Sequence, residues 1–106
     1  MLNVIVNRET WLRGEGSDKS FLLRPADGKM CCMGFAESVR NPLSDILGAR
    51  EVVRADYPNH VNCLSDIYQI NDNPTLSDHE REQRLIGLGP IIGINFSFTG
   101  NDDDGA

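Results

Sequence analysis

The stretch Ile92-Gly93-Ile94-Asn95-Phe96-Ser97-Phe98 alternates apolar residues with small or polar ones. A period of two is typical of a β-strand with one buried face. Residues 2–6, Leu-Asn-Val-Ile-Val, show the same alternation at the other end of the chain. We therefore expect the N- and C-terminal strands to pair in a small antiparallel sheet, within an α+β fold.

Three segments between these strands carry apolar residues at helical spacing. They cover residues 32–39, 60–70 and 78–88, where apolar side chains recur at intervals of three and four. Asn41-Pro42 should end the first helix, because the residue before a proline disfavours helical backbone. We expect about three helices to cover one face of the sheet.

The helix over 78–88 has the clearest local signal. Ser77 followed by Glu80 matches a capping box, in which each side chain binds the backbone N–H of the other residue. Gly89-Pro90 should end this helix.

Shorter patterns predict further elements. Phe21-Leu22-Leu23-Arg24 is a strand candidate that would form a hairpin-like arrangement with residues 2–6, and residues 43–47 would add a short helical turn. Residues 99–106 lack apolar periodicity and are acidic. They are expected to form a flexible tail, which leaves residues 1–98 as a single domain.

Composition and charge exclude several classes of protein. The 106 residues are 40% hydrophobic and 25% charged, as in an ordinary globular domain. The net charge is −6, so the chain lacks a general basic footprint for nucleic acid. No run of about 18 apolar residues and no signal peptide is found, which predicts a cytoplasmic protein without membrane contact. The odd number of cysteines, three, argues against a secreted disulfide framework.

Several clusters of residues stand out along the chain. They are Trp11-Leu12-Arg13-Gly14, Phe21-Leu22-Leu23-Arg24, Asp27-Gly28-Lys29-Met30-Cys31-Cys32-Met33-Gly34-Phe35, Asn71-Asp72-Asn73-Pro74, Leu76-Ser77, Glu80-Arg81-Glu82 and Gly93-Ile94-Asn95-Phe96. Together they resemble a family of small phage and prophage proteins of no established activity. The resemblance implies a mobile-element protein that acts in the bacterial cytoplasm, where small proteins of this kind often bind and block a host component.

The thiols and imidazoles form no recognisable metal-binding or catalytic motif. Cys31 and Cys32 are adjacent and Cys63 is distant, so the spacing of zinc ligands is missing. Free cysteines are usually buried, although Cys31 as a nucleophile with His60 or His79 as its base is an alternative. We predict a non-enzymatic protein without a metal or cofactor.

An acidic surface in the second half of the chain is the first candidate binding site. Its residues are Asp72, Asp78, Glu80 and Glu82. Such carboxylates could imitate nucleic-acid phosphates and occupy the basic groove of a partner protein. The simpler interpretation is a solvated helix face.

A group of arginines around the single tryptophan is the rival candidate. Its residues are Arg8, Trp11, Arg13 and Arg24. Arginine and an aromatic ring together suit an anionic ligand such as a nucleotide. The simpler interpretation is that Trp11 packs in the core and the arginines pair with nearby acids.

The leading functional hypothesis is a phage accessory protein that binds and inhibits a host protein with a basic surface. Such a protein would resemble anti-CRISPR inhibitors of bacterial defence, and direct binding of nucleic acid is not expected. The alternative is a binding protein or sponge for a small nucleotide signal, with homodimer formation left open. A cysteine-dependent enzyme using Cys31 ranks third.

Overall fold

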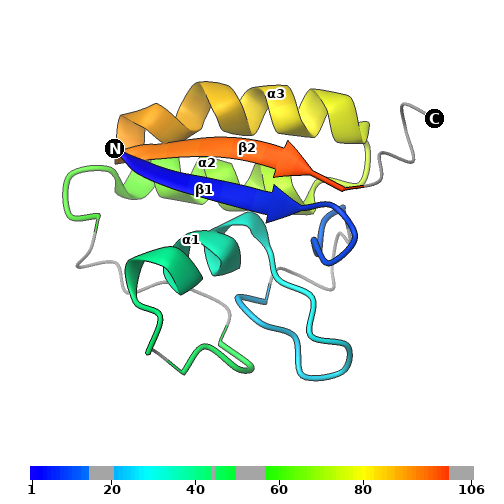
Figure 1. Cartoon of the computed structure of the whole chain (residues 1–106). Helices are drawn as coiled ribbons and strands as arrows, with labels where there is room; N and C mark the ends of the chain where they lie inside the picture. Colours follow the sequence, from blue (N-terminus) through cyan, green and yellow to red (C-terminus); the bar gives the residue numbers. More distant parts are fainter. Residues whose placement is uncertain (15–20, 44, 50–56, 101–106) are drawn as a thin grey trace.

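Six elements make up the part of the chain that the computed structural model describes, residues 1–14, 21–43, 45–49 and 57–100. In chain order they are β1 (Leu2–Asn7), α1 (Cys32–Arg40), α2 (Val61–Asp72), α3 (Asp78–Leu88), the 3-10 helix η3 (Gly89–Ile92) and β2 (Ile94–Thr99). The α+β class predicted from the sequence is confirmed (Figure 1).

β1 and β2 form a two-stranded parallel sheet, with Leu2 opposite Ile94 and Asn7 opposite Thr99. The predicted pairing of the first and last strands is confirmed, but their predicted antiparallel orientation is wrong. Parallel neighbours require a crossover connection, which the helices between β1 and β2 provide (Figure 1). Alternation of apolar residues tells which side chains face the core, but it carries no information about strand direction.

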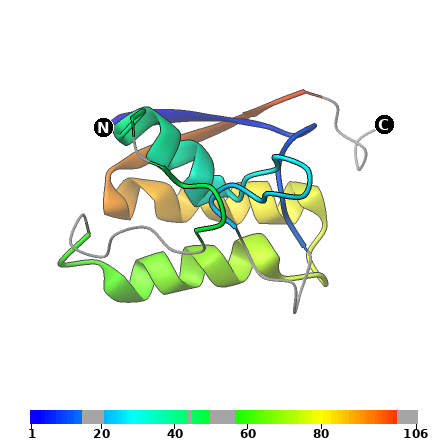
Figure 2. The same cartoon turned by 90° about the horizontal axis from the view of Figure 1, so that it is seen from below.

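The helices cover one face of this sheet. Val4 and Val6 of β1 and Ile94 and Phe96 of β2 are buried, whereas the residues between them face outward. Figure 2 shows α1 and α3 next to the sheet and α2 farthest from it. The one-sided cover predicted from the sequence is therefore present.

The three predicted helices correspond to α1, α2 and α3. In the capping box of α3, the Glu80 N–H donates to the Ser77 Oγ at 3.1 Å, and the Ser77 N–H donates to the Glu80 Oε1 at 3.2 Å. α3 ends at Leu88, as predicted. α1 ends at Arg40, directly before Asn41-Pro42.

The predicted strand at 21–24 does not form a hairpin with β1. Leu23 makes an isolated parallel bridge with Leu47, and the Leu22 N–H donates to the Ala49 carbonyl at 2.7 Å. Leu47 therefore takes part in a bridge, and the described residues of the predicted helical turn at 43–47 are not helical. β2 extends to Thr99, and residues 101–106 of the predicted tail lie outside the described residues.

Gly34 lets the start of α1 approach the segment that precedes it. A Cβ added at Gly34 would overlap the backbone carbonyl of Leu22. Because a backbone carbonyl cannot rotate aside as a side chain can, this position in the helix requires glycine.

We expect the substitution Gly34→Ala to destabilise the protein by about 2–3 kcal/mol, because the added methyl group must push two backbone segments apart. Gly87→Ala is the matched control, since an added Cβ in α3 meets no atom within 4 Å. The control should be neutral or stabilising by up to about 1 kcal/mol. Urea unfolding, followed by the fluorescence of the single tryptophan, measures the free energy of unfolding of both variants. If the two variants were equally stable, the close packing at Gly34 would be contradicted.

Candidate functional site

The side chain of Asn71, which is fully buried, joins three segments of the chain. Its Oδ1 accepts hydrogen bonds from Trp11 Nε1 at 2.9 Å and from the Cys32 backbone N–H at 3.1 Å. Its Nδ2 donates to the Leu12 carbonyl at 3.0 Å. One amide thus fixes the segment after β1 and the start of α1 against the end of α2.

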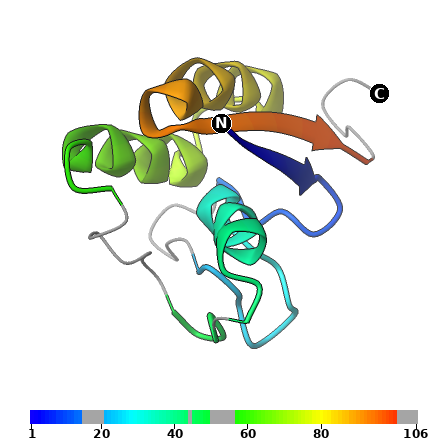
Figure 3. The ribbon, with the colours of Figure 1, turned by 60° about the vertical axis from the view of Figure 1, so that its left-hand side comes forward.

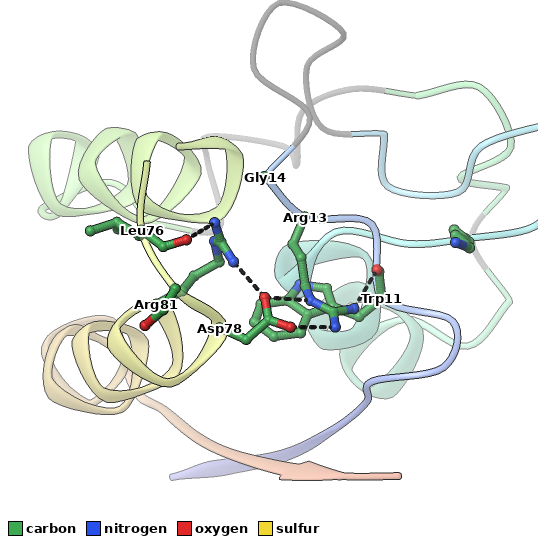
Figure 4. A pocket seen from close by; sticks show the side chains of 8 residues that line it. Trp11, Arg13, Gly14, Leu76, Asp78 and Arg81 are labelled. Atoms are coloured by element: carbon green, nitrogen blue, oxygen red, sulfur yellow. Dashed lines mark hydrogen bonds and ion pairs between the residues drawn. The ribbon is translucent and has the colours of Figure 1, made fainter. Parts of the chain in front are cut away.

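Next to this junction, Arg13 and Arg81 both bind the carboxylate of Asp78 (Figure 4). Arg13 Nε and Nη2 donate to the two carboxylate oxygens at 2.9 and 2.6 Å, and Arg81 Nη1 donates to Oδ1 at 2.7 Å. The Arg13 guanidinium also lies 4.7 Å from the centre of the Trp11 ring, within range of a cation–π contact. The hydrogen bond from Arg13 is the main cause that lowers the pKa of Asp78, although partial burial opposes it.

Arg81 is the more structural of the two arginines, since only 3% of it is exposed. Its Nε donates to the Ile70 carbonyl at 3.3 Å, and its Nη2 donates to the carbonyls of Asn73 at 2.5 Å and Leu76 at 2.9 Å. These acceptors lie at the end of α2 and in the connection to α3. Arg81 therefore ties both helices together, as expected for a cation near helix carbonyls.

The two rival sets of candidate residues turn out to be partners of each other. Arg13 binds Asp78, and Arg8 binds Glu82 through two parallel hydrogen bonds of 2.8 and 2.7 Å. In the acidic set, Asp78 and Glu82 are thus engaged by arginines of the other set. Bidentate pairs of this kind fix both geometry and charge.

The remaining candidate residues are not members of these ion pairs, although the Trp11 ring lies against Arg13. Glu80 is exposed and caps α3, Asp72 is half-buried, and Trp11 is only 2% exposed, as expected for a core residue. Arg24 binds Asp27 at 2.6 Å, and this hydrogen bond is the main cause that lowers the pKa of Asp27 to about 2. The structure therefore brings together three of the four residues of the arginine set and leaves Arg24 elsewhere.

The cysteines and histidines are not assembled into a site. Cys31 and Cys32 are fully buried, and burial raises the pKa of the Cys32 thiol well above its ordinary value. Burial also raises the pKa of Cys63, which is half-buried. His60 and His79 are exposed. Among the described residues, no group of three or more His, Cys, Asp or Glu side chains could hold a metal ion.

A pocket of about 320 Å³ opens beside the Arg13–Asp78 pair (Figure 4). Its lining residues are Trp11, Arg13, Gly14, Lys29, Leu76, Ser77, Asp78 and Arg81. Within the described part of the chain, the lining therefore carries three cationic side chains and one carboxylate. We call it the cationic pocket.

Lys29 is the lining cation that the protein itself uses least. Among the described residues it makes no ion pair, whereas Arg13 and Arg81 are both engaged with Asp78. Ser77 also lines the pocket, but its side chain is already engaged with Glu80, whose backbone N–H donates to the Ser77 Oγ and whose carboxylate accepts from the Ser77 hydroxyl. Of the lining residues, the sequence analysis singled out Trp11, Arg13 and Asp78 as binding candidates, and it identified Ser77 only as a helix cap.

Comparison with protein-family models, with curated proteins and with solved structures finds no match to this chain. Each helix within the described ranges is too short or too polar to cross a membrane.

Replacing Asn71 by Ala should destabilise the protein by about 3 kcal/mol, because it leaves two buried N–H donors and one carbonyl without their partner. Asn62→Ala is the matched control, since Asn62 lies on the same helix and is exposed. Urea unfolding measures both variants. If Asn62→Ala were as destabilising as Asn71→Ala, the hydrogen bonds of Asn71 would not be the cause.

We also predict that Asp78 contributes to acid sensitivity. Because its pKa is lower in the folded protein than the ordinary 3.8, its stabilising contribution is complete above that ordinary value and is lost as the pH falls through the folded value. Asp78→Asn should lower the free energy of unfolding at pH 7 and flatten its decline in acid. Urea unfolding at a series of pH values tests this. The variant Asp66→Asn, at an exposed position on α2, should keep the wild-type profile.

Proposed function

We propose that this chain is a non-enzymatic binding protein whose cationic pocket holds a small anionic ligand. The observation that carries the proposal is the excess of positive charge among the described lining residues, where Arg13, Lys29 and Arg81 accompany one carboxylate, that of Asp78. The resemblance to phage and prophage proteins adds the proposed context, a mobile-element product that acts on a small molecule of its bacterial host.

The geometry of the pocket supports a compact, polar ligand. A volume of about 320 Å³ is at the small end of ligand sites, which run from roughly 300 to 1,000 Å³. Arg13 is held by Asp78 and by the Trp11 ring before any ligand arrives. A side chain that is already ordered loses little entropy on binding, which favours affinity.

The lining residues support binding rather than catalysis. The pocket contains no cysteine or histidine. The Ser77 Oγ is bound to the Glu80 N–H in the capping box, and Arg13 and Arg81 hold the Asp78 carboxylate. A nucleophile needs a base within hydrogen-bond reach, and a carboxylate paired with two arginines is a poor base.

Inhibition of a host protein through an acidic surface is less well supported. That hypothesis needs carboxylates that face a partner, but Asp78 and Glu82 are paired within the chain. It would have to rely on Glu80 and Asp72, of which Glu80 also caps α3. The arrangement of charges therefore favours the small-ligand function over the inhibitor.

Thermal shift at constant ionic strength tests the proposal, with inorganic phosphate, a nucleoside monophosphate and malonate as probes. At least one probe should raise the melting temperature of the wild type, because a ligand that binds only the folded state stabilises it. Lys29→Ala should weaken binding by roughly tenfold, the effect of losing about 1.4 kcal/mol.

Arg84→Ala is the control, since Arg84 is an exposed cation on α3 outside the pocket. It should bind the probe as the wild type does. If Lys29→Ala and Arg84→Ala weakened probe binding equally, the probe would be attracted by charge in general and not bound at the cationic pocket. The absence of a shift with all three probes would contradict the proposed function.

A further inference from the structure

Arg13 lines the cationic pocket with its hydrogen-bonding capacity almost fully used. A guanidinium carries five N–H donors, and four of those of Arg13 have partners within the chain. Nε and Nη2 donate to the two carboxylate oxygens of Asp78, while Nη1 donates to the carbonyls of Arg8 at 2.9 Å and Trp11 at 3.1 Å. Within the described part of the chain, one N–H on Nη2 is left for a ligand.

The edge of Arg13 that binds carboxylates best is the one that Asp78 occupies. Arginine favours a carboxylate through two parallel N–H···O bonds, and Asp78 accepts both of them. Arg81 also holds this carboxylate, at 2.7 Å. Because Asp78 belongs to the same chain, it competes with any ligand at a high effective concentration. A ligand carboxylate therefore cannot gain the bidentate contact on which an arginine site depends for its preference.

Lys29 supplies the donors that the arginines lack. The segment after β1 lies beside the loop that precedes α1 (Figure 3), and the bridge between Trp11 and Met30 brings Lys29 into the lining of the pocket. An ammonium group carries three N–H donors, and those of Lys29 have no partner among the described residues. Because an ammonium is a compact point charge without the planar fork of a guanidinium, Lys29 favours a ligand that concentrates its charge on one group.

We propose that the cationic pocket binds the phosphate group of a phosphate monoester in preference to a carboxylate, which presupposes the proposed function as an anion site. A phosphate monoester carries about −1.5 to −2 charge at pH 7 on a single group. The described lining has three cationic side chains and one carboxylate, so its excess of two positive charges matches this ligand. The oxygens of a tetrahedral group also point in different directions. One oxygen can bind Lys29 while another accepts from the remaining N–H of Arg13.

The pocket offers no aromatic surface for a nucleobase. Trp11 is the one aromatic residue among the described lining residues, and it is only 2% exposed. Its ring contacts the Arg13 guanidinium (Figure 4) and lies 5.0 Å from the ring centre of Phe98. Bases are commonly bound by stacking on aromatic side chains, for which Trp11 has no exposed face. The pocket therefore binds phosphate monoesters whether or not they carry a base.

Isothermal titration calorimetry of the full chain at pH 7 and constant ionic strength tests this preference. The probes are glycerol 3-phosphate, adenosine monophosphate and malonate. Malonate is the matched probe, because its total charge is similar to that of a phosphate monoester but is divided between two carboxylates. Glycerol 3-phosphate should bind at least about tenfold more tightly than malonate, and adenosine monophosphate should bind within about threefold of glycerol 3-phosphate.

Two variants test the cause of the preference. Asp78→Asn replaces the bidentate carboxylate by a neutral amide, so malonate should gain more affinity than glycerol 3-phosphate and the ratio should fall at least about threefold. Lys29→Ala should also reduce the ratio, because it removes the point charge that favours phosphate. Asp66→Asn, at an exposed position on α2, is the control and should keep the wild-type ratio.

The possible outcomes separate this preference from the proposed function. If malonate bound as tightly as glycerol 3-phosphate, or adenosine monophosphate at least about tenfold more tightly, the preference would be wrong while the anion site would stand. A wild-type ratio in both Asp78→Asn and Lys29→Ala would overturn the preference as well. If none of the three probes bound to the wild type, the proposed function would fail, and the preference would fail with it.

Discussion

The hydrogen bonds of the Asn71 amide are the interaction on which the arrangement of this fold depends. A buried amide must find partners for its donor and acceptor groups, since leaving them unpaired costs several kcal/mol in total. Here the partners are Trp11, Leu12 and Cys32, which are distant from Asn71 in sequence. By fixing Trp11 and Leu12, Asn71 also places the next residue, Arg13, where its guanidinium reaches Asp78. The packing of the core and the geometry of the cationic pocket therefore both depend on the hydrogen bonds of Asn71.

This dependence explains several of the residues that stand out in the sequence. Trp11, Cys32, Gly34, Asn71 and Arg81 all belong to the clusters named in the sequence analysis, and each has a structural role in the junction or in the packing around it. Residues of this kind report on the fold more than on a ligand, because a change at any of them leaves a buried group unpaired or two segments in collision. The packing of this chain is therefore enough to account for these residues, without a role for them in binding.

Lys29 differs from these residues, although it lies in one of the same clusters. Its ammonium group makes no ion pair with the described residues, although its charge also acts on the Asp27 carboxylate. A half-buried lysine keeps its ammonium group within reach of water, and therefore also of an external anion. This contrast within one cluster is the reason to place the function at the pocket.

How far the sequence predicts an interaction depends on how many positions separate its residues along the chain. The capping box of Ser77 and Glu80 spans three residues, and it is present in α3 as predicted. The pairing of Arg8 with Glu82 joins residues 74 positions apart. Charge alone does not say which of sixteen acidic residues an arginine will meet, because only the packing of α3 against the sheet brings these two together. Strand orientation was unpredictable for the same reason, since it is set by the path of the chain.

Because its arginines are paired with carboxylates of the same chain, the pocket attracts an anion only at short range. Arg8 is paired with Glu82, and Arg13 and Arg81 share the carboxylate of Asp78. The potential at a distance from the molecule therefore follows its net charge of −6. At physiological ionic strength, the positive potential of Lys29 is screened beyond about 8 Å. A small anion therefore gains little from long-range steering and must bind through short contacts inside the recess. Large polyanions would bring most of their charge against the acidic exterior. The distribution of charge thus favours a compact anion as the proposed ligand, through repulsion outside the pocket as much as through attraction within it.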